Sequence, residues 1–479
     1  MIRLYNLYKY FFQLLILIVL TAFGVYFIPP QFNKILFLLL LIPVWKSKND
    51  YFWFAYLLIL LEIPGGLFWG GTLDSPNRLP IYTLVPKVST SFTELFTLLF
   101  FIKGFYRNQW YRYKSFVYRK WYGYLGFLLI ILLILSFALG MSRVHFIPIS
   151  RGFISLSFFV SVIFIFKNQE DIVNFFKMIF PFAFVAILLQ LYGMINHKQL
   201  VEIFNPLIST TQGVLTGDEI RPIEMVTVLF FCFFGSLLYL GNKKSGFSQS
   251  YLLVVNITSY VSILMTGTRS WFLGFSLMYL FYFYLNYKRI GKKIISIVIT
   301  IGFFLVIMFM IPQIDTQVKI ASVRLATIQK LAAGDLTAGG TLSRLTERGP
   351  RVMEGFKNST IIFGAGYSDL YFEYGDTHVG FQNNLLQSGV IGFFILFSFA
   401  ATLFFTPLRI LKKFSYRPDL RTILRNLPLL IPGVLIINSA TQFWGFGLVY
   451  MSRIMLLAAY ISISSIYIQA YQNQACIKQ

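Results

Sequence analysis

The sequence FGAGYSDLYFEYGDTHVGF, residues 363–381, ends the only long polar interval between two strongly apolar parts of the chain. This interval runs from Ile314 to Gly380 and lies between the apolar runs Ile295–Ile311 and Phe381–Phe405. Apolar runs of roughly 20 residues are long enough to cross a bilayer as helices. The pattern therefore predicts a water-exposed segment between membrane-spanning helices, with the rest of the chain as its scaffold.

The composition is that of a membrane protein. The chain has 479 residues, of which 57% are hydrophobic and 12% charged, whereas a soluble domain has about 25% charged residues. In lipid, only helices or a closed barrel can satisfy the backbone. Barrel strands would alternate polar and apolar residues, which these runs do not. We therefore predict an all-α, polytopic bundle of membrane helices.

Basic residues concentrate in short loops at every second interval, which predicts about 14 helices with both termini in the cytoplasm. If the three shortest runs do not span, about 12 helices cross the membrane. The predicted helices are residues 11–27, 33–44, 51–69, 92–105, 122–139, 152–166, 172–194, 223–240, 251–264, 271–285, 295–311, 381–405, 427–439 and 448–468.

This pattern predicts the organisation of the chain. Helices 1–11 occupy residues 1–313, and a large extracytoplasmic loop occupies residues 314–380. Helices 12–14 and a cytoplasmic tail occupy residues 381–479. Residues 70–91 are predicted to form a smaller outer loop. The predicted localisation is the cytoplasmic (inner) membrane.

A net charge of +23 invites a nucleic-acid interpretation, but the alternation of basic loops indicates membrane orientation instead, so no nucleic acid is expected. The loop Arg107–Lys120 combines basic and aromatic residues, which suits contact with lipid headgroups at the cytoplasmic surface. Cys232 lies in an apolar run and Cys476 in the tail, so no disulfide framework is indicated.

Two arginines at outer helix ends are candidates for binding phosphate. Arg269 follows the turn Thr266-Gly267-Thr268, and Arg221 opens the eighth predicted helix. A guanidinium presents a planar fork that matches phosphate oxygens. The alternatives are snorkelling of Arg269 to the interface and a local ion pair of Arg221 with Asp218 or Glu219.

Arg344, Arg348 and Arg351 have the spacing that places side chains on one face of a helix. Arg344 and Arg348 are candidate diphosphate ligands. Glu347 and Glu354 are spaced for pairing with these arginines, so a solvated, salt-bridged helix is the alternative.

His378, one of three histidines, lies where the polar interval meets the next apolar run. Histidine can accept a proton near neutral pH, and the carboxylate of Asp376 could hold its tautomer. The alternative is an interfacial histidine without chemistry. The interval has one histidine and no cysteine, so metal-ligand spacing is absent.

In their order along the chain, three motifs resemble those of the O-antigen ligase/polymerase family of bacterial membrane glycosyltransferases. The first is Thr266-Gly267-Thr268-Arg269, and the second is Phe363-Gly364-Ala365-Gly366. The third is His378 followed by Gly389 and Gly392, similar to the family's His-Asn…Gly-x-x-Gly pattern, although Val379 stands where the family often has asparagine. The resemblance covers roughly helices 8 to 12.

The resemblance implies glycan transfer outside the cytoplasmic membrane from an undecaprenyl-diphosphate-linked glycan, without a cofactor or metal. Arginines would hold the diphosphate, and His378 would act on the acceptor hydroxyl as a base or by orienting it. The acceptor would be a glycan or lipid, and a flippase and a chain-length regulator are the protein partners it suggests. On this pattern the diphosphate ligands are Arg269, Arg221, Arg344 and Arg348, and the supporting residues are Asp376, Gly364, Gly366, Gly389 and Gly392.

Three functions stay open from the sequence. A polymerase would join lipid-linked repeat units, and a ligase would move the finished glycan to a lipid core or another acceptor. The third is a flippase for lipid-linked oligosaccharide. A flippase needs no large outer loop beside a histidine, so the interval Ile314–Gly380 argues against it.

Overall fold

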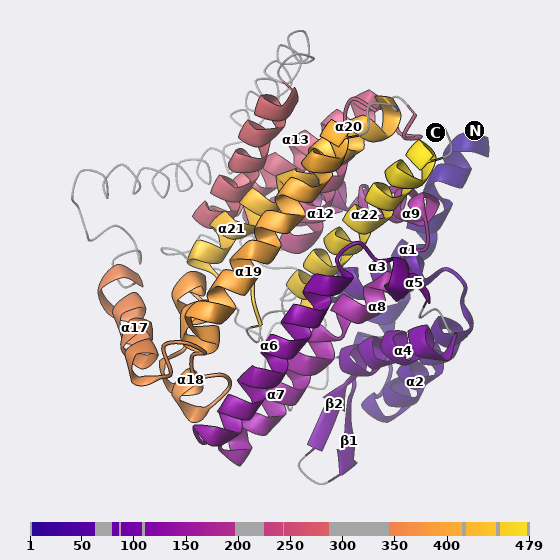
Figure 1. Cartoon of the computed structure of the whole chain (residues 1–479). Coiled ribbons are helices and arrows are strands. Elements are labelled where there is room, and N and C mark those ends of the chain that lie inside the picture. Colours follow the sequence, from indigo (N-terminus) through magenta and orange to yellow (C-terminus); the bar gives the residue numbers. More distant parts are fainter. Residues whose placement is uncertain are drawn as a thin grey trace. The chain divides into compact units, whose positions relative to one another are not determined.

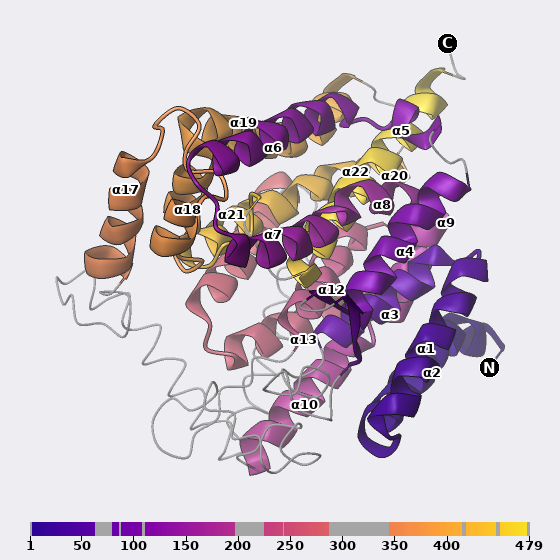
Figure 2. The same cartoon turned by 90° about the horizontal axis from the view of Figure 1, so that it is seen from below.

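The computed structural model describes residues 2–62, 79–85, 88–107, 111–196, 225–242, 244–286, 344–413, 418–446 and 451–476. These residues are almost entirely helical (Figures 1 and 2). The predicted all-α class is therefore confirmed. The chain forms two compact units, with residues 1–109, 161–268 and 286–321 in unit 1 and residues 110–160, 269–285 and 322–479 in unit 2.

Within the described residues, seven helices are long and apolar enough to cross a membrane, which confirms a multi-pass membrane protein. Shorter apolar helices cover Val226–Tyr239 and Gln249–Met265, and another helix covers residues 269–286. The predicted span 295–311 lies outside the described residues. The seven candidate spans are Lys9–Phe27, Arg119–Ala138, Arg143–Ile165, Gln169–Asn196, Gly380–Lys413, Leu420–Ala440 and Met451–Asn473.

Unit 1 is built mainly of helices around α12, in which every residue is buried. A helix that is apolar on all sides is expected at the centre of a bundle. The elements are α1 (Ile2–Phe27), α2 (Pro30–Lys46), α3 (Asp50–Glu62), β1 (Ile81–Val85), β2 (Val88–Ser91), α4 (Phe92–Tyr106), α9 (Gln169–Ile179), α10 (Phe182–Asn196), α12 (Val226–Tyr239) and α13 (Gln249–Met265). Helix α8 (Phe158–Ile165) contains the point where the chain passes from unit 2 to unit 1.

The structure differs from the predicted elements of unit 1 in two places. The helix expected over residues 172–194 is divided into α9 and α10, because Pro181 has no amide hydrogen and cannot continue the ladder of hydrogen bonds. The loop expected over residues 70–91 contains the antiparallel strands β1 and β2. The Tyr82 hydroxyl of this hairpin donates to the Lys34 carbonyl at 2.9 Å.

Three basic residues of unit 1 pair with the buried carboxylate of Asp50. Asp50 pairs with the Lys103 ammonium, with Lys167 at 3.3 Å and with Arg107 at 3.8 Å. The Lys103 ammonium also donates to the Val44 carbonyl at 2.6 Å. A buried charge is tolerated when it is paired and hydrogen-bonded in this way. The loops that meet here follow the second, fourth and sixth predicted helices, so their proximity agrees with the predicted alternation.

Unit 2 contains the described residues of the candidate site. Figure 1 places α17 and α18 at the N-terminal end of α19, and α6 runs beside α19 in both views. The elements are α5 (Tyr111–Ser115), α6 (Arg119–Ala138), α7 (Arg143–Leu156), the helix 269–286, a turn of π-helix η1 (Arg344–Arg348), α17 (Gly349–Asn358), α18 (Asp369–Tyr374), α19 (Gly380–Lys413), α20 (Pro418–Asn426), η2 (Leu427–Leu429), α21 (Leu430–Ala440) and α22 (Met451–Cys476).

Candidate functional site

Helix α19 is broken at Gly389, inside the span that the sequence predicts as one helix. Gly389 has φ 62° and ψ −170°, a conformation that is essentially restricted to glycine. A break inside a membrane helix leaves backbone carbonyls on one side and amides on the other without helical partners. Such groups need partners in a setting where water is scarce.

The turn 360–366 supplies those partners. Backbone amides of the turn donate to the last carbonyls before the break, and backbone amides after the break donate to carbonyls of the turn. The hydrogen bonds are Ala365 to Leu386 at 2.7 Å, Gly366 to Gln387 at 2.9 Å, Val390 to Ile361 at 3.0 Å and Ile391 to Ile362 at 3.1 Å. The turn 360–366 is thereby bound through its backbone to the break in α19.

Close backbone packing explains the glycines singled out in the sequence. At Gly364, with φ +75°, a Cβ atom would lie 2.6 Å from both the Leu386 carbonyl oxygen and the Gly389 amide nitrogen. At Gly366, with φ +61°, it would meet helix α6. Gly364, Gly366 and Gly389 therefore meet at one junction, and Gly392 lies further along α19, against Ser388 and Leu128.

Helix α6 holds the other side of this turn through Ser136. The Tyr367 amide donates to the Ser136 hydroxyl at 2.6 Å. The Tyr367 side chain is fully buried, and its hydroxyl donates to the Phe446 carbonyl at 2.8 Å. Tyr367 thus connects the polar segment both to α6 and to the loop 441–446.

Replacing Ser136 with alanine should lower the free energy of unfolding by about 1–3 kcal/mol, because the buried Tyr367 amide would lose its acceptor. Thermal denaturation of the purified protein measures this effect. The matched control is Ser439→Ala, because the Ser439 side chain is exposed and, among the described residues, bonds to the Ile436 carbonyl of its own helix at 2.7 Å. Equal midpoints for the two variants would contradict the anchoring role of Ser136.

Buried amide side chains connect the first half of α19 to the loop 441–446. The side chains of Asn383, Asn384 and Gln442 are almost fully buried. Asn383 Nδ2 donates to Gln442 Oε1 at 2.7 Å, and Gln442 Nε2 donates to Asn384 Oδ1 at 3.1 Å. Asn384 Nδ2 donates to the Trp444 carbonyl at 2.8 Å. A buried polar network whose members satisfy one another rigidifies its surroundings.

Asp376 organises the turn that carries His378. The Asp376 Oδ1 atom accepts the backbone amide of His378 at 2.8 Å. Its Oδ2 atom lies 3.4 Å from Arg351 NH2 and 3.8 Å from Arg348 Nε. Asp376 therefore supports His378 through the backbone. It also pairs with Arg348 and Arg351, for which the sequence suggested Glu347 and Glu354 as partners.

His378 lies exposed at the start of α19. The amide of Gln442 donates to the carbonyl of Thr377 at 2.5 Å, so the backbone on both sides of the turn is held. The buried Tyr371 side chain accepts from Asn383 Nδ2 at 3.3 Å. Burial raises the pKa of Tyr371 to about 12, while the hydrogen bond from Asn383 acts in the opposite direction. Tyr371 therefore stays protonated at neutral pH.

The loop 441–446 also contacts the start of the helix 269–286 and Arg453. Trp271, two residues after Arg269, packs against the Phe443 ring with centroids 5.6 Å apart. The Arg453 guanidinium lies 5.7 Å from the same ring centroid and donates to the Gln442 carbonyl at 2.9 Å. The loop therefore contacts the His378 turn, the helix that begins at Arg269, and Arg453.

The sequence analysis did not identify Arg453 or His145. Arg453 could have been found as a charged residue near the start of an apolar run. The His145 ring stacks on Phe372 with centroids 3.9 Å apart and an interplanar angle of 4°. Its Nε2 atom lies 3.5 Å from Asp369 Oδ1. Over 220 residues separate these partners in sequence, so no local spacing reveals them.

The remaining candidate residues are only partly described. Arg221 lies outside the described residues. Arg344 begins η1, and its side chain is likewise outside the described part. Among the residues that the structure describes, no group of three or more His, Cys, Asp or Glu side chains is placed to hold a metal ion.

The amino-acid sequence matches no protein-family model, and no curated protein matches it significantly. The lengths and apolar composition of the helices show that the chain is a multi-pass helical membrane protein.

Proposed function

We propose that the protein is a membrane glycosyltransferase that polymerises undecaprenyl-diphosphate-linked oligosaccharide units into a surface polysaccharide on the outer face of the cytoplasmic membrane. The observation that carries the proposal is the meeting of three features at the loop 441–446. These are the turn bearing His378, the helix that begins at Arg269, and Arg453.

The proposed reaction uses these groups in separate roles. An acceptor hydroxyl attacks the anomeric carbon of the donor sugar, and the bond from that carbon to the diphosphate oxygen breaks. The hydroxyl proton passes to a ring nitrogen of His378, as expected of a general base. The electron pair of the broken bond leaves on the diphosphate. Guanidinium groups at the membrane surface stabilise the charge that develops there.

The rigidity of the surroundings supports this assignment. Catalysis by fixed charges requires groups that are already in position before the reaction. The break at Gly389, its backbone bonds to the turn 360–366 and the buried amides of Asn383 and Gln442 hold the polar segment against α19. An exposed histidine on such a framework can meet a substrate at the membrane surface without moving the core.

Analysis of the glycan made by a deletion strain tests the proposed function. If the protein is a polymerase, the strain should attach only single repeat units to the acceptor. Long polymer that accumulates on undecaprenyl diphosphate would instead indicate a ligase. Repeat units retained on the cytoplasmic face would indicate a flippase.

Arg269→Lys should reduce polymer formation roughly 10- to 100-fold, because a charge-assisted hydrogen bond contributes about 1.5–3 kcal/mol and lysine cannot make the two-pronged contact. Glycan length and amount in cells, at matched protein level, measure the effect. Arg409→Lys is the control, because Arg409 is exposed in the last two turns of α19, away from the break. Normal polymer in the Arg269→Lys strain would favour a snorkelling arginine.

A further inference from the structure

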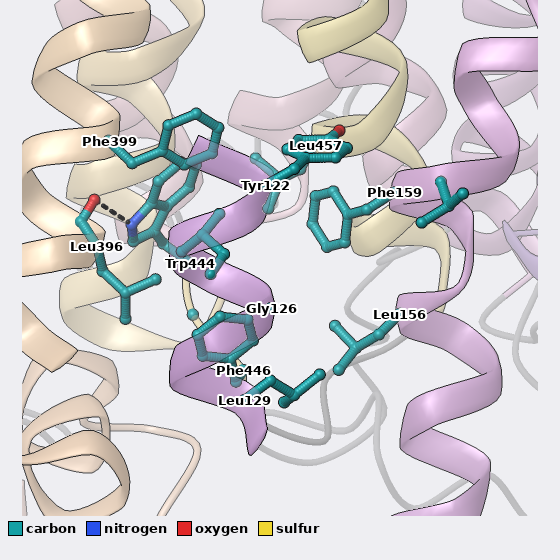
Figure 3. A pocket seen from close by; sticks show the side chains of 13 residues that line it. Tyr122, Gly126, Leu129, Leu156, Phe159, Leu396, Phe399, Trp444, Phe446 and Leu457 are labelled. Atoms are coloured by element: carbon teal, nitrogen blue, oxygen red, sulfur yellow. Dashed lines mark hydrogen bonds between the residues drawn. The ribbon is translucent and has the colours of Figure 1, made fainter. Parts of the chain in front are cut away.

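An apolar pocket lies in unit 2 between α6, the α7–α8 region, α19 and α22 (Figure 3). Its volume is about 160 Å³. An apolar cavity of about 150 Å³ stays dry and accommodates benzene, so this pocket has room for about six carbon atoms. The inner wall is formed by the buried side chains of Leu396, Phe399, Trp444 and Leu457. The Trp444 indole nitrogen already donates to the Leu396 carbonyl at 3.2 Å, so this wall offers an apolar surface.

The pocket opens at Gly126 of α6. Gly126 is exposed, and a Cβ atom there would meet nothing within 4 Å. The neighbouring side chains of Phe127 and Ile130 are 65% and 56% exposed. Because α6 is a candidate membrane span, this exposed apolar surface faces hydrocarbon. A chain from the bilayer can therefore enter beside Gly126.

Tyr122 is among the residues that line the pocket. Its hydroxyl is inaccessible and makes no hydrogen bond within the part of the chain that the structure describes, so this side chain offers the pocket its apolar surface. Tyr122 lies at the end of the pocket nearest the start of α6, about one helical turn from Arg119.

The start of α6 carries exposed positive charge. Arg119 and Lys120 are both exposed, and Arg119 donates to the Lys114 carbonyl at 2.6 Å. This corner packs on α22, where the Tyr118 and Ser464 hydroxyls lie 2.8 Å apart. Basic residues at the membrane end of a helix attract anionic lipid headgroups. Positive charge and an apolar pocket therefore follow one another along α6.

We propose that this arrangement binds one anionic phospholipid. Its phosphate lies against Arg119 and Lys120, and a stretch of one acyl chain occupies the pocket beside Gly126. The order of phosphate and acyl chain in a phospholipid matches the order of the basic residues and the pocket along α6. The proposal does not depend on the glycosyltransferase function.

The headgroup contact is tested by binding to the purified, delipidated full-length protein. Phosphatidylglycerol and phosphatidylcholine with identical acyl chains are titrated and bound lipid is counted by native mass spectrometry. We expect phosphatidylglycerol to bind more tightly than phosphatidylcholine. Arg119→Gln and Lys120→Gln should each lower the affinity for phosphatidylglycerol roughly five-fold. Equal affinity of the two lipids for the unmodified protein would overturn the proposal.

The pocket is tested by filling it. Gly126→Leu should weaken binding of both lipids at least ten-fold without lowering the thermal midpoint, because the added side chain meets open space. Gly123→Leu is the matched control, since Gly123 is also open but does not line the pocket, and its binding should be unchanged. Unchanged binding by Gly126→Leu, or displacement of phosphatidylglycerol by equimolar undecaprenyl phosphate, would overturn the proposal.

Discussion

His378→Gln should lower the rate of glycan transfer by roughly 10²- to 10⁴-fold, the usual contribution of a positioned general base. Glutamine can form a hydrogen bond but cannot accept the proton. The variant therefore separates proton acceptance by His378 from orientation of the acceptor hydroxyl. The exposed side chain can change without disturbing the core, because Asp376 and Gln442 hold the turn through the backbone atoms of His378 and Thr377. Transfer is measured with purified enzyme at matched concentrations, and His378→Ala should be at least as inactive.

His145→Gln is the matched control for this prediction. His145 lies in the same unit and also has a neighbouring carboxylate, Asp369, at 3.5 Å. We expect this variant to retain most of the activity. If His378→Gln kept near-normal activity while His378→Ala lost it, His378 would only orient the acceptor. If both His378 variants kept near-normal activity and His145→Gln lost it, the base would be His145.

Gly389→Ala should destabilise the protein by roughly 3–5 kcal/mol. A non-glycine residue in this backbone conformation costs about 1–3 kcal/mol, and each hydrogen bond lost between the turn 360–366 and the broken helix costs about 1 kcal/mol more. A Cβ at this position would collide with the Ile362 carbonyl and the Gly364 amide. The thermal midpoint of the purified protein measures the loss.

Gly123→Ala controls for the substitution itself, because a Cβ at Gly123 meets nothing within 4 Å. Its thermal midpoint should stay at or above that of the unmodified protein. A Gly389→Ala midpoint equal to that of Gly123→Ala would show that the junction of α19 with the turn 360–366 adds little stability.

The apolar runs predicted where helices lie, and the ends of several of them to within a few residues. The helix expected at 152–166 instead begins at Arg143 and is divided between α7 and α8. The run expected at 122–139 is α6 (Arg119–Ala138), and the run expected at 92–105 is α4 (Phe92–Tyr106). Burial in lipid imposes helical hydrogen bonding on any long apolar stretch, so local composition is sufficient. The predicted total of about 12–14 spans stays a prediction, because several of them lie outside the described residues.

The breaks and the site were harder to predict. The pattern Gly389-Val390-Ile391-Gly392 is compatible with a continuous helix, and the turn that fills the break is contributed by residues 360–366, outside that helix. The sequence did not predict the hydrogen bond from the His378 backbone amide to Asp376, and the orientation of the His378 ring by Asp376 stays a prediction. Arg453 and His145 reach their partners only through tertiary packing, which no sequence spacing encodes.

Reconstitution of the purified protein with one defined donor tests whether the protein itself polymerises the glycan. The donor is undecaprenyl diphosphate carrying a single repeat unit, supplied in liposomes with a metal chelator present, and both glycan length and free undecaprenyl diphosphate are measured. We expect a ladder of polymer, with one undecaprenyl diphosphate released for each new linkage, and loss of both products with His378→Gln. A donor that remains a single unit, or that only crosses the bilayer unchanged, would contradict it.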